Sequence, residues 1–376
     1  MKRVSFAAAL AVAFVAVSCI KDEPRNEEAD IERVWVSVSA PADVFFSPSD
    51  SVVDVMSTET SIVFCVRRTA DLKSLAPQFR LTPGATVDPP SGSAHDFSQG
   101  AVDYTVTSEA GGQSRTYSVA VRHVSLTEHF DFENYFLNDQ MGSAFYQWVE
   151  VGLSGDSSKI WASGNSGFAL SNGSAKPDEF PTAVLPNGYE GNGVRLVTRS
   201  TGELGAMFNM PIAAGNLFLG SFDLASALLS PLSATRFGVP VDYRPARFTG
   251  MYKYAPGEKF TNAAQEVVEG VTDSAAIYAV VYRNHDAEGN NVMLDGSNVL
   301  TSPLLIATAE MPEVTPVGSW TPFDIPFTYL SEPDSATLAN RGYSLSVVFS
   351  SSKKGDTFEG AVGSTLCIDK VTVARE

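Results

Sequence analysis

The sequence predicts an all-β protein built from two sandwiches, a small one followed by a larger one of the jelly-roll kind. Three observations predict this class. Short runs of alternating apolar and polar residues recur along the chain. Turns rich in Gly, Pro, Ser, Asn and Asp separate these runs. No amphipathic helix of about twelve or more residues lies between them, which disfavours parallel α/β folds.

The first residues of the sequence predict a secretory signal. In MKRVSFAAALAVAFVAVSC, Lys2 and Arg3 precede a short apolar run and small residues before Cys19. The run is shorter than the ~20 residues that a membrane-spanning helix needs. The sequence VSC resembles the lipobox of bacterial lipoproteins, which implies that residues 1–18 are a signal peptide and that Cys19 carries a lipid.

Residues 19–30 are polar and charged, which predicts a flexible tether. Lys21, Asp22 and Glu23 resemble the surface-export signal of Bacteroidetes lipoproteins, a lysine followed by two acidic residues. The resemblance implies a lipid anchor in the outer membrane and a protein that faces the cell surface. The alternative is an ordinary linker in a lipoprotein that faces the periplasm.

The composition excludes some partners and frameworks. A net charge of −17 repels phosphate backbones and anionic lipid heads, so nucleic acid is not an expected partner. Only Cys65 and Cys367 follow Cys19, and they lie in separate predicted domains, so we expect no disulfide framework. We expect both to be buried in apolar packing.

Residues 31–124 form the first predicted sandwich. Its candidate strands are VWVSVSA, SIVFCVRR, QFRLTPGATV, VDYTVTS and RTYSVAVRH. The elements GATVDPPSG, DFS and YTVTSEAGG followed by TYSVAV resemble the immunoglobulin-like modules that follow the tether in many Bacteroidetes surface lipoproteins. The resemblance implies an Ig-like β-sandwich that acts as a spacer.

Residues 125–376 form the second predicted sandwich. Its candidate strands are GVRLVTR, LFLGSFDL, ARFTGMYKYA, AAIYAVVYR, PLLIATAEM, YSLSVVFSSS and STLCIDKVTV. Strands joined by Gly, Pro and Asn loops over this length predict one large jelly roll. The stretch LASALLSPLSA has the composition of a short helix, and Pro231 interrupts it.

Several ordered strings in this second region carry a family resemblance. They are HFDFENY, AGNLFLGSF, FGVPVDYRPARFTGMYKY, GSWTPFDIPFTY and FSSSKKGDTFEGAVGSTLCIDKVTV. Together they resemble the "putative carbohydrate metabolism domain" (PCMD) of Bacteroidetes lipoproteins, over about the last two thirds of the chain. The resemblance implies a jelly roll similar to carbohydrate-binding modules.

The common catalytic motifs are absent from the sequence. The four histidines lack the spacing of a zinc site, and no phosphate-binding glycine loop or nucleophile elbow occurs. Glycoside hydrolysis needs only two carboxyl groups about 5 to 10 Å apart, with no local motif. The available carboxylates are Asp242, Asp286, Asp324, Asp356 and Glu359.

Sugar binding needs an aromatic ring for the apolar face of a pyranose and a few polar side chains for its hydroxyls. The candidates lie in three places in the sequence: Trp148 and Trp161 flank a polar loop, DYRPARFTGMYKY contains Tyr243, Arg244, Arg247, Tyr252 and Tyr254, and Asp356 lies near the end of the chain. The alternative is that these aromatic side chains fill the core. In particular, Lys253 on the opposite strand face indicates that Tyr252 and Tyr254 point inward.

Asp369 lies on a mostly apolar face of the last predicted strand, with Cys367, Val371 and Val373, and opposite Leu366 and Ile368. A buried carboxylate needs a partner. The strings FEN and CIDKV resemble the two ends of carbohydrate-binding jelly rolls that pair their first and last strands and bind a structural calcium ion.

That resemblance implies Asp131, Glu133 and Asp369 as calcium ligands. The alternative is that Glu133 and Asp369 accept hydrogen bonds from backbone amides or from Lys370. In either case we expect Asp369 to lie beside the strand that contains Asp131 and Glu133.

The predicted function is non-catalytic binding of a polysaccharide or oligosaccharide by a surface lipoprotein, as part of polysaccharide capture or utilisation. One alternative is a glycoside hydrolase that uses two loop carboxylates. The other is an adhesin or a fimbria-like structural component.

Overall fold

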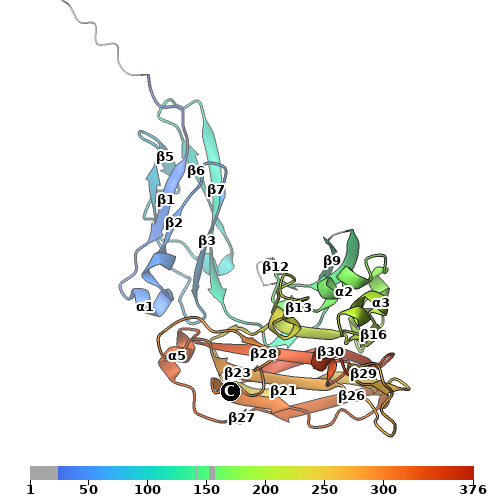
Figure 1. Cartoon of the computed structure of the whole chain (residues 1–376). Helices are drawn as coiled ribbons and strands as arrows, with labels where there is room; N and C mark the ends of the chain where they lie inside the picture. Colours follow the sequence, from blue (N-terminus) through green and yellow to red (C-terminus); the bar gives the residue numbers. More distant parts are fainter. Residues whose placement is uncertain (1–23, 141, 152–156) are drawn as a thin grey trace, which may run out of the picture. The chain divides into compact units, whose positions relative to one another are not determined.

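The computed structural model describes residues 24–140, 142–151 and 157–376. The predicted signal peptide, Cys19 and the export signal lie outside the described residues. The chain divides into two compact units between Val124 and Ser125 (Figure 1). No helix in the described residues has the length and apolar character that a membrane span requires.

The first unit is a pair of sheets. One sheet has the order β2-β1-β4, and the other has the order β3-β7-β6-β5. β3 and β7 pair in parallel, and the remaining pairs are antiparallel. The strands are β1 (Ile31–Val36), β2 (Val52–Asp54), β3 (Ser61–Arg67), β4 (Pro77–Leu81), β5 (Thr86–Asp88), β6 (Val102–Thr107) and β7 (Ser114–Val124), with the single-turn α1 (Pro41–Val44) after β1.

Alternation along β3 builds the core of this unit. Ile62, Phe64 and Val66 point inward and are buried, so Cys65 between them points outward. Cys65 is therefore exposed. The expectation that Cys65 packs in the core is wrong, because the side chain lies on the outward face of the strand. Cys367 is buried as expected, and neither cysteine forms a disulfide.

The second unit is a sandwich of two large sheets within the described residues. The nine-stranded sheet has the order β24-β19-β18-β28-β23-β25-β27, with β13 on β18 and β20 on β28, and the six-stranded sheet has the order β14-β15-β30-β21-β26, with β8 on β30. One apolar cluster draws residues from both sheets, among them Phe248, Ile368, Leu219 and Val347. The prediction of an all-β fold with two sandwiches is confirmed.

The strands of the nine-stranded sheet are β13 (Trp161–Ala162), β18 (Asn216–Phe222), β19 (Thr235–Phe237), β20 (Val239–Val241), β23 (Ala276–Arg283), β24 (Leu294–Asp295), β25 (Leu305–Glu310), β27 (Thr328–Tyr329) and β28 (Tyr343–Ser350). Those of the six-stranded sheet are β8 (His129–Phe130), β14 (Thr182–Leu185), β15 (Gly193–Val197), β21 (Pro245–Ala255), β26 (Val317–Pro326) and β30 (Thr365–Arg375).

Both faces of the nine-stranded sheet are apolar. On β23, Ile277 and Val281 point into the sandwich core, whereas Tyr278, Val280 and Tyr282 point to the opposite face. There they form a second apolar cluster with side chains that include Phe218, Phe237, Leu294 and Val299. We call this second surface the outer face of the sheet. Short helices and loops cover it.

The covering elements are α2 (Asn165–Ser171), α3 (Gly202–Met207) and α4 (Pro231–Ala234), while α5 (Ser335–Ala339) precedes β28. α4 begins at Pro231. The first N–H groups of a helix have no partner within the helix, so proline is tolerated there. Pro231 therefore starts the short helix predicted in LASALLSPLSA and does not interrupt it. Smaller pairs complete the unit: β9 (Tyr135–Gln140) with β10 (Ser143–Trp148), β11 (Glu150–Val151) with β12 (Ser157–Ser158), β16 (Arg199–Ser200) with β17 (Ile212–Ala213), and β22 (Phe260–Thr261) with β29 (Gly360–Ala361).

β30 contains a bulge that changes its inward face. Lys370 has a φ of 48°, and the register with β21 shifts between Asp369 and Thr372. Leu366 and Ile368 before the bulge and Val371 and Val373 after it all lie in the same core. Strict alternation along the strand predicted that these two pairs lie on opposite faces. The extra residue of the bulge shifts the alternation by one position, so that both pairs point into the core.

Candidate functional site

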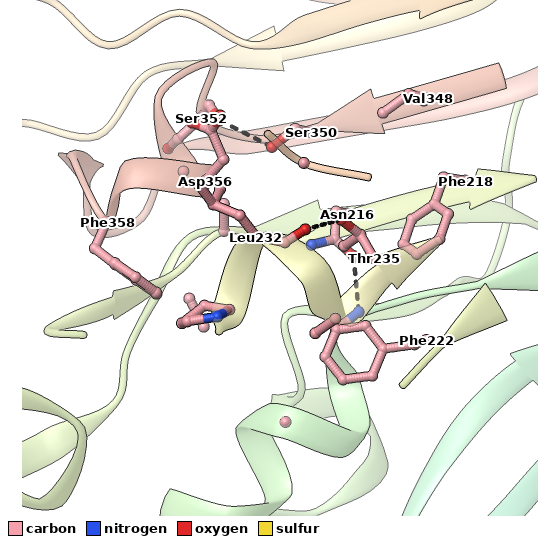
Figure 2. A pocket seen from close by; sticks show the side chains of 18 of the residues that line it. Asn216, Phe218, Phe222, Leu232, Thr235, Val348, Ser350, Ser352, Asp356 and Phe358 are labelled. Atoms are coloured by element: carbon pink, nitrogen blue, oxygen red, sulfur yellow. Dashed lines mark hydrogen bonds between the residues drawn. The ribbon is translucent and has the colours of Figure 1, made fainter. Parts of the chain in front are cut away.

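A cavity of about 650 Å³ lies on the outer face of the nine-stranded sheet, and we call it the first cavity. Figure 2 shows Asn216, Phe218 and Phe222 of β18 in its wall, with Asp356 and Phe358 from the turn that follows β28. Its volume lies within the roughly 300–1,000 Å³ typical of small-molecule sites.

The walls of the first cavity are mostly apolar. Phe218 is buried in the sheet's outer cluster, while Phe222 and Phe358 are half-buried. Exposed apolar side chains line its rim, namely Leu204, Phe208, Leu228 and Leu300. An apolar surface left open to solvent around a cavity is typical of a binding site.

A few polar groups enter this apolar surface. Asn216 Oδ1 accepts a hydrogen bond from the Gly164 N–H at 2.8 Å, which fixes the orientation of the amide. Ser350 Oγ donates to the Ser352 carbonyl at 2.8 Å. At the end of β25, Lys353 Nζ lies 3.2 Å from Glu310 Oε1, in an exposed ion pair.

Two carboxyl groups, Asp356 and Glu310, line this cavity together. Burial raises the pKa of Tyr278 well above its ordinary value, and the negative charges of Asp356 and Glu310 raise it further, so both carboxylates lie close to that phenol. Asp356 is exposed as a residue, yet desolvation of its carboxyl group raises its pKa, and Glu359 adds to the effect.

The turn that carries Asp356 is strained. Phe358 follows the 3-10 turn Gly355–Thr357 with φ 59° and ψ 29°, a left-handed conformation that bulky residues rarely adopt. Such outliers cluster at ligand-binding sites, because the surrounding structure has to impose them. Here the strained turn brings a carboxylate and an aromatic ring to one cavity.

The five predicted aromatic residues belong to the core. Trp148 and Trp161 are 1% exposed, Tyr252 and Tyr254 are 2% exposed, and Tyr243 is 4% exposed. All five lie in the apolar cluster between the two sheets. A ring with so little open surface is not an open platform for a pyranose, so the expectation of an exposed aromatic platform at these residues is wrong. The alternative, inward-pointing tyrosines, describes Tyr252 and Tyr254.

The two predicted arginines already have partners inside the unit. Arg244 pairs with Glu332 at 3.3 Å and with Glu376, and its guanidinium lies 3.9 Å from the centroid of the Tyr329 ring. Arg247 pairs with Asp324 at 2.7 Å across β21 and β26. These contacts stabilise the six-stranded sheet and the chain end, and neither arginine lines the first cavity.

Of the five carboxylates considered for catalysis, only Asp356 lines the first cavity. Asp242 accepts a hydrogen bond from Ser125, Asp286 stabilises the 286–290 turn, Asp324 pairs with Arg247, and Glu359 pairs with Lys354. Asp356 is therefore the predicted site residue that the fold brings to the first cavity.

The predicted pairing of the domain's two ends is confirmed, because β8 pairs with β30 through Phe130 and Val371. Asp369 Oδ2 accepts from the N–H groups of Tyr189 and Glu190, at 2.7 and 3.0 Å. Asp369 Oδ1 accepts from the Lys370 N–H at 2.7 Å.

Glu133 binds the same loop, because its two oxygens accept from the backbone and side-chain amides of Asn192. Asp131 Oδ1 accepts from the Glu133 N–H. Calcium requires six to eight oxygen ligands, whereas these oxygens face N–H donors. Among the described residues, no cluster of three or more metal-binding side chains occurs. The geometry does not fit the expected calcium site and matches the alternative of amide partners.

Sequence reasoning missed Asn216, Phe222, Glu310 and Phe358 as cavity residues. Two of them lie in the family string AGNLFLGSF, where an asparagine begins a strand and a phenylalanine ends it. The available signal was that several apolar residues fall in the segments 202–210 and 224–232, which connect the predicted strands, whereas such connections are normally polar.

Comparison with known proteins places the second unit in a family. Residues 131–374, more than half of the chain, match the model described as "Putative carbohydrate metabolism domain". The chain belongs to this family. Residues 44–121 match the model "SGBP, N-terminal", the N-terminal domain of surface glycan-binding proteins. No curated protein matches the chain.

Two solved structures are similar to this PCMD protein. One is a "putative glycoside hydrolase" from Bacteroides thetaiotaomicron VPI-5482, with 39% identity and a TM-score of 0.64, over 95% of this chain and 99% of that chain. The other is a "putative glycoside hydrolase" from Bacteroides vulgatus ATCC 8482, with 39% identity and a TM-score of 0.63, over 67% of this chain and 99% of that chain. The resemblance to PCMD proteins is confirmed.

Proposed function

We propose that this protein is a cell-surface lipoprotein that binds glycan without cleaving it and so captures a polysaccharide. The first cavity carries the proposal. Its aromatic walls suit the apolar face of a pyranose, and its few polar groups suit the hydroxyls. In this proposal Phe222 and Phe358 contact the ring, while Asn216 and Asp356 bond the hydroxyls.

The organisation of the chain supports the same proposal. The lipobox-like sequence at Cys19 supplies an anchor, and the polar residues 19–30 supply a tether. The first unit, which matches the N-terminal domain of surface glycan-binding proteins, acts as the spacer. The PCMD unit then provides the glycan site.

Glycoside hydrolysis is the second candidate, because Asp356 and Glu310 line one cavity and differ in environment. A raised pKa suits Asp356 as a general acid, and Glu310, which pairs with Lys353, supplies the second carboxyl group. Two relatives are described as putative glycoside hydrolases.

Affinity electrophoresis through gels that contain single polysaccharides tests the proposal. We expect retention by at least one polysaccharide, and loss of about tenfold or more in affinity for Asp356→Asn and Phe358→Asn. Asparagine tolerates the left-handed backbone at residue 358, so this change removes the ring without adding strain. Asp324→Asn, an equivalent change outside the cavity, should be retained like the unaltered protein.

A reducing-sugar assay on the retained polysaccharide separates the two candidates. Binding without release of reducing sugar supports capture. Release that disappears in Asp356→Asn supports the hydrolase instead. Failure of every polysaccharide to retain the protein would contradict the proposed function.

A further inference from the structure

A second cavity, of about 560 Å³, lies next to the first. The β9–β10 hairpin, the segment that follows β13 and the end of β18 line it. Phe222 lines both cavities, so the two spaces adjoin at this ring. The same ring therefore borders both spaces.

The second cavity is more polar than the first. Its lining includes Asn138, Gln147, Lys159, Ser163, Ser166 and Ser221. Hydroxyl, amide and ammonium groups of this kind bind sugar hydroxyls, which both donate and accept hydrogen bonds. The exposed apolar side chains that surround the first cavity do not line the second. The first cavity therefore suits the apolar face of a sugar ring, and the second suits the hydroxyl groups.

Two amides on the hairpin form an ordered pair. Asn138 Nδ2 donates to Gln147 Oε1 at 2.9 Å, and this bond fixes both side chains. It leaves Asn138 Oδ1 as an acceptor and Gln147 Nε2 as a donor, and neither atom has a protein partner in the part of the chain that the structure describes. An acceptor beside a donor matches two neighbouring hydroxyl groups of one sugar.

Trp148, one of the residues beside the second cavity, has an unsatisfied donor. Trp148 lines the cavity, and its Nε1 is buried without a hydrogen-bond partner among the described residues. By contrast, the neighbouring Trp161 Nε1 donates to Glu150 at 2.7 Å. A buried N–H without a partner is unfavourable, and such groups in folded proteins usually have a ligand or a water as partner.

We infer that the second cavity is a second sugar subsite, and that the protein binds an oligosaccharide segment that crosses Phe222 and occupies both cavities. The inference rests on the proposed function. The amide pair of Asn138 and Gln147 bonds adjacent hydroxyls, the Trp148 ring forms part of the wall, and the exposed Lys159 closes the rim. The bound unit is a run of several sugars rather than one terminal sugar.

Calorimetric titration with a series of oligosaccharides, from disaccharide to hexasaccharide, tests this subsite. The series is prepared from the polysaccharide that retains the protein in affinity gels. We expect the Kd of the unaltered protein to fall about tenfold or more along the series. Gln147→Met with Lys159→Met should lose most of that gain. Lys259→Met, an exposed lysine that lines neither cavity, should keep it.

A second measurement reports on Trp148 directly. The indole N–H resonance of Trp148 should shift when the hexasaccharide binds and should stay unchanged with the disaccharide. If the double variant fails to fold, Lys159→Met alone replaces it, because that side chain is exposed.

The outcomes separate the two proposals. No binding at any length contradicts the proposed function itself. Binding without a gain along the series, or a gain that the double variant retains in full, overturns the second subsite and leaves the proposed function standing.

Discussion

Two carboxylates with raised pKa values show how this protein accommodates charge inside a β-sandwich. Asp369 is 0% exposed, and burial raises its pKa although three backbone N–H groups bond its oxygens. Removing those donors would leave an uncompensated charge in the core. The carboxylate that looks misplaced in the sequence therefore connects β30 to the loop before β15.

Glu150 is the second case. Burial raises its pKa from 4.5 to about 7, the Trp161 hydrogen bond opposes the rise, and the charge of Asp131 adds to it. Because the folded protein holds this proton more tightly than the unfolded chain, the ionisation of Glu150 destabilises the fold. The cost is absent below about pH 4.5, grows as the pH rises, and is complete above about pH 7.

The variant Glu150→Gln tests whether ionisation of Glu150 lowers the stability of the protein as the pH rises. Glutamine keeps an acceptor for Trp161 Nε1 and cannot ionise, so the variant should match the unaltered protein near pH 4.5. At pH 8 the free energy of unfolding of the variant should exceed that of the unaltered protein by about 3 kcal/mol, because the rise from 4.5 to about 7 is worth about 1.4 kcal/mol per pKa unit. Urea denaturation of both proteins across this range measures the difference. A difference that stays constant with pH would contradict the prediction.

At the scale of elements, the loop 187–193 joins the two ends of the second unit. Glu133 follows β8, Asp369 belongs to β30, and both bind this loop from different sides. Gly191 has a φ of 70°, and a Cβ at this position would collide with Glu133 Oε1. The loop therefore needs glycine here both for its backbone and for the close approach of a carboxylate.

We expect Gly191→Ala to destabilise the protein by about 2 kcal/mol or more, because it adds a collision to the backbone cost. Gly289→Ala is the matched control, since Gly289 has a φ of 86° and open space around its Cβ position. The control should lose only about 1 kcal/mol. Urea denaturation compares the two variants, and equal losses would contradict the role of Glu133.

At the scale of the whole molecule, the two units have separate apolar cores. The core of the first unit is drawn from residues 29–121, and the core between the sheets of the second unit is drawn from residues 130–373. A domain with its own core is expected to fold independently. This separation is compatible with the spacer and the binding unit of the proposed function.

Residues 24–124 expressed alone should therefore fold. We expect a dispersed amide proton spectrum and a single cooperative thermal transition. The fragment 125–376 provides the reciprocal measurement and should melt cooperatively as well. A first fragment without a cooperative transition would show that its core depends on the rest of the chain.

The sequence by itself determined the all-β class, the two sandwiches and the membership of the second unit in its family. Alternation is a local property of a pleated strand, so β3, β21 and β23 are readable from their residues alone. The pairing of β8 with β30 was also predictable, because FEN and CIDKV resemble the two ends of carbohydrate-binding jelly rolls, which pair their first and last strands.

Only the tertiary structure decided which side chains are available to a ligand. Alternation cannot show that Tyr278 faces a covered sheet surface, that a bulge at Lys370 reverses the parity of β30, or that Trp148 and Tyr252 lie in a core. The first cavity joins Asn216, Glu310 and Asp356, which are far apart in the chain. Burial depends on what packs against a strand from elsewhere, so the site was determined by the folded sandwich and not by any one segment.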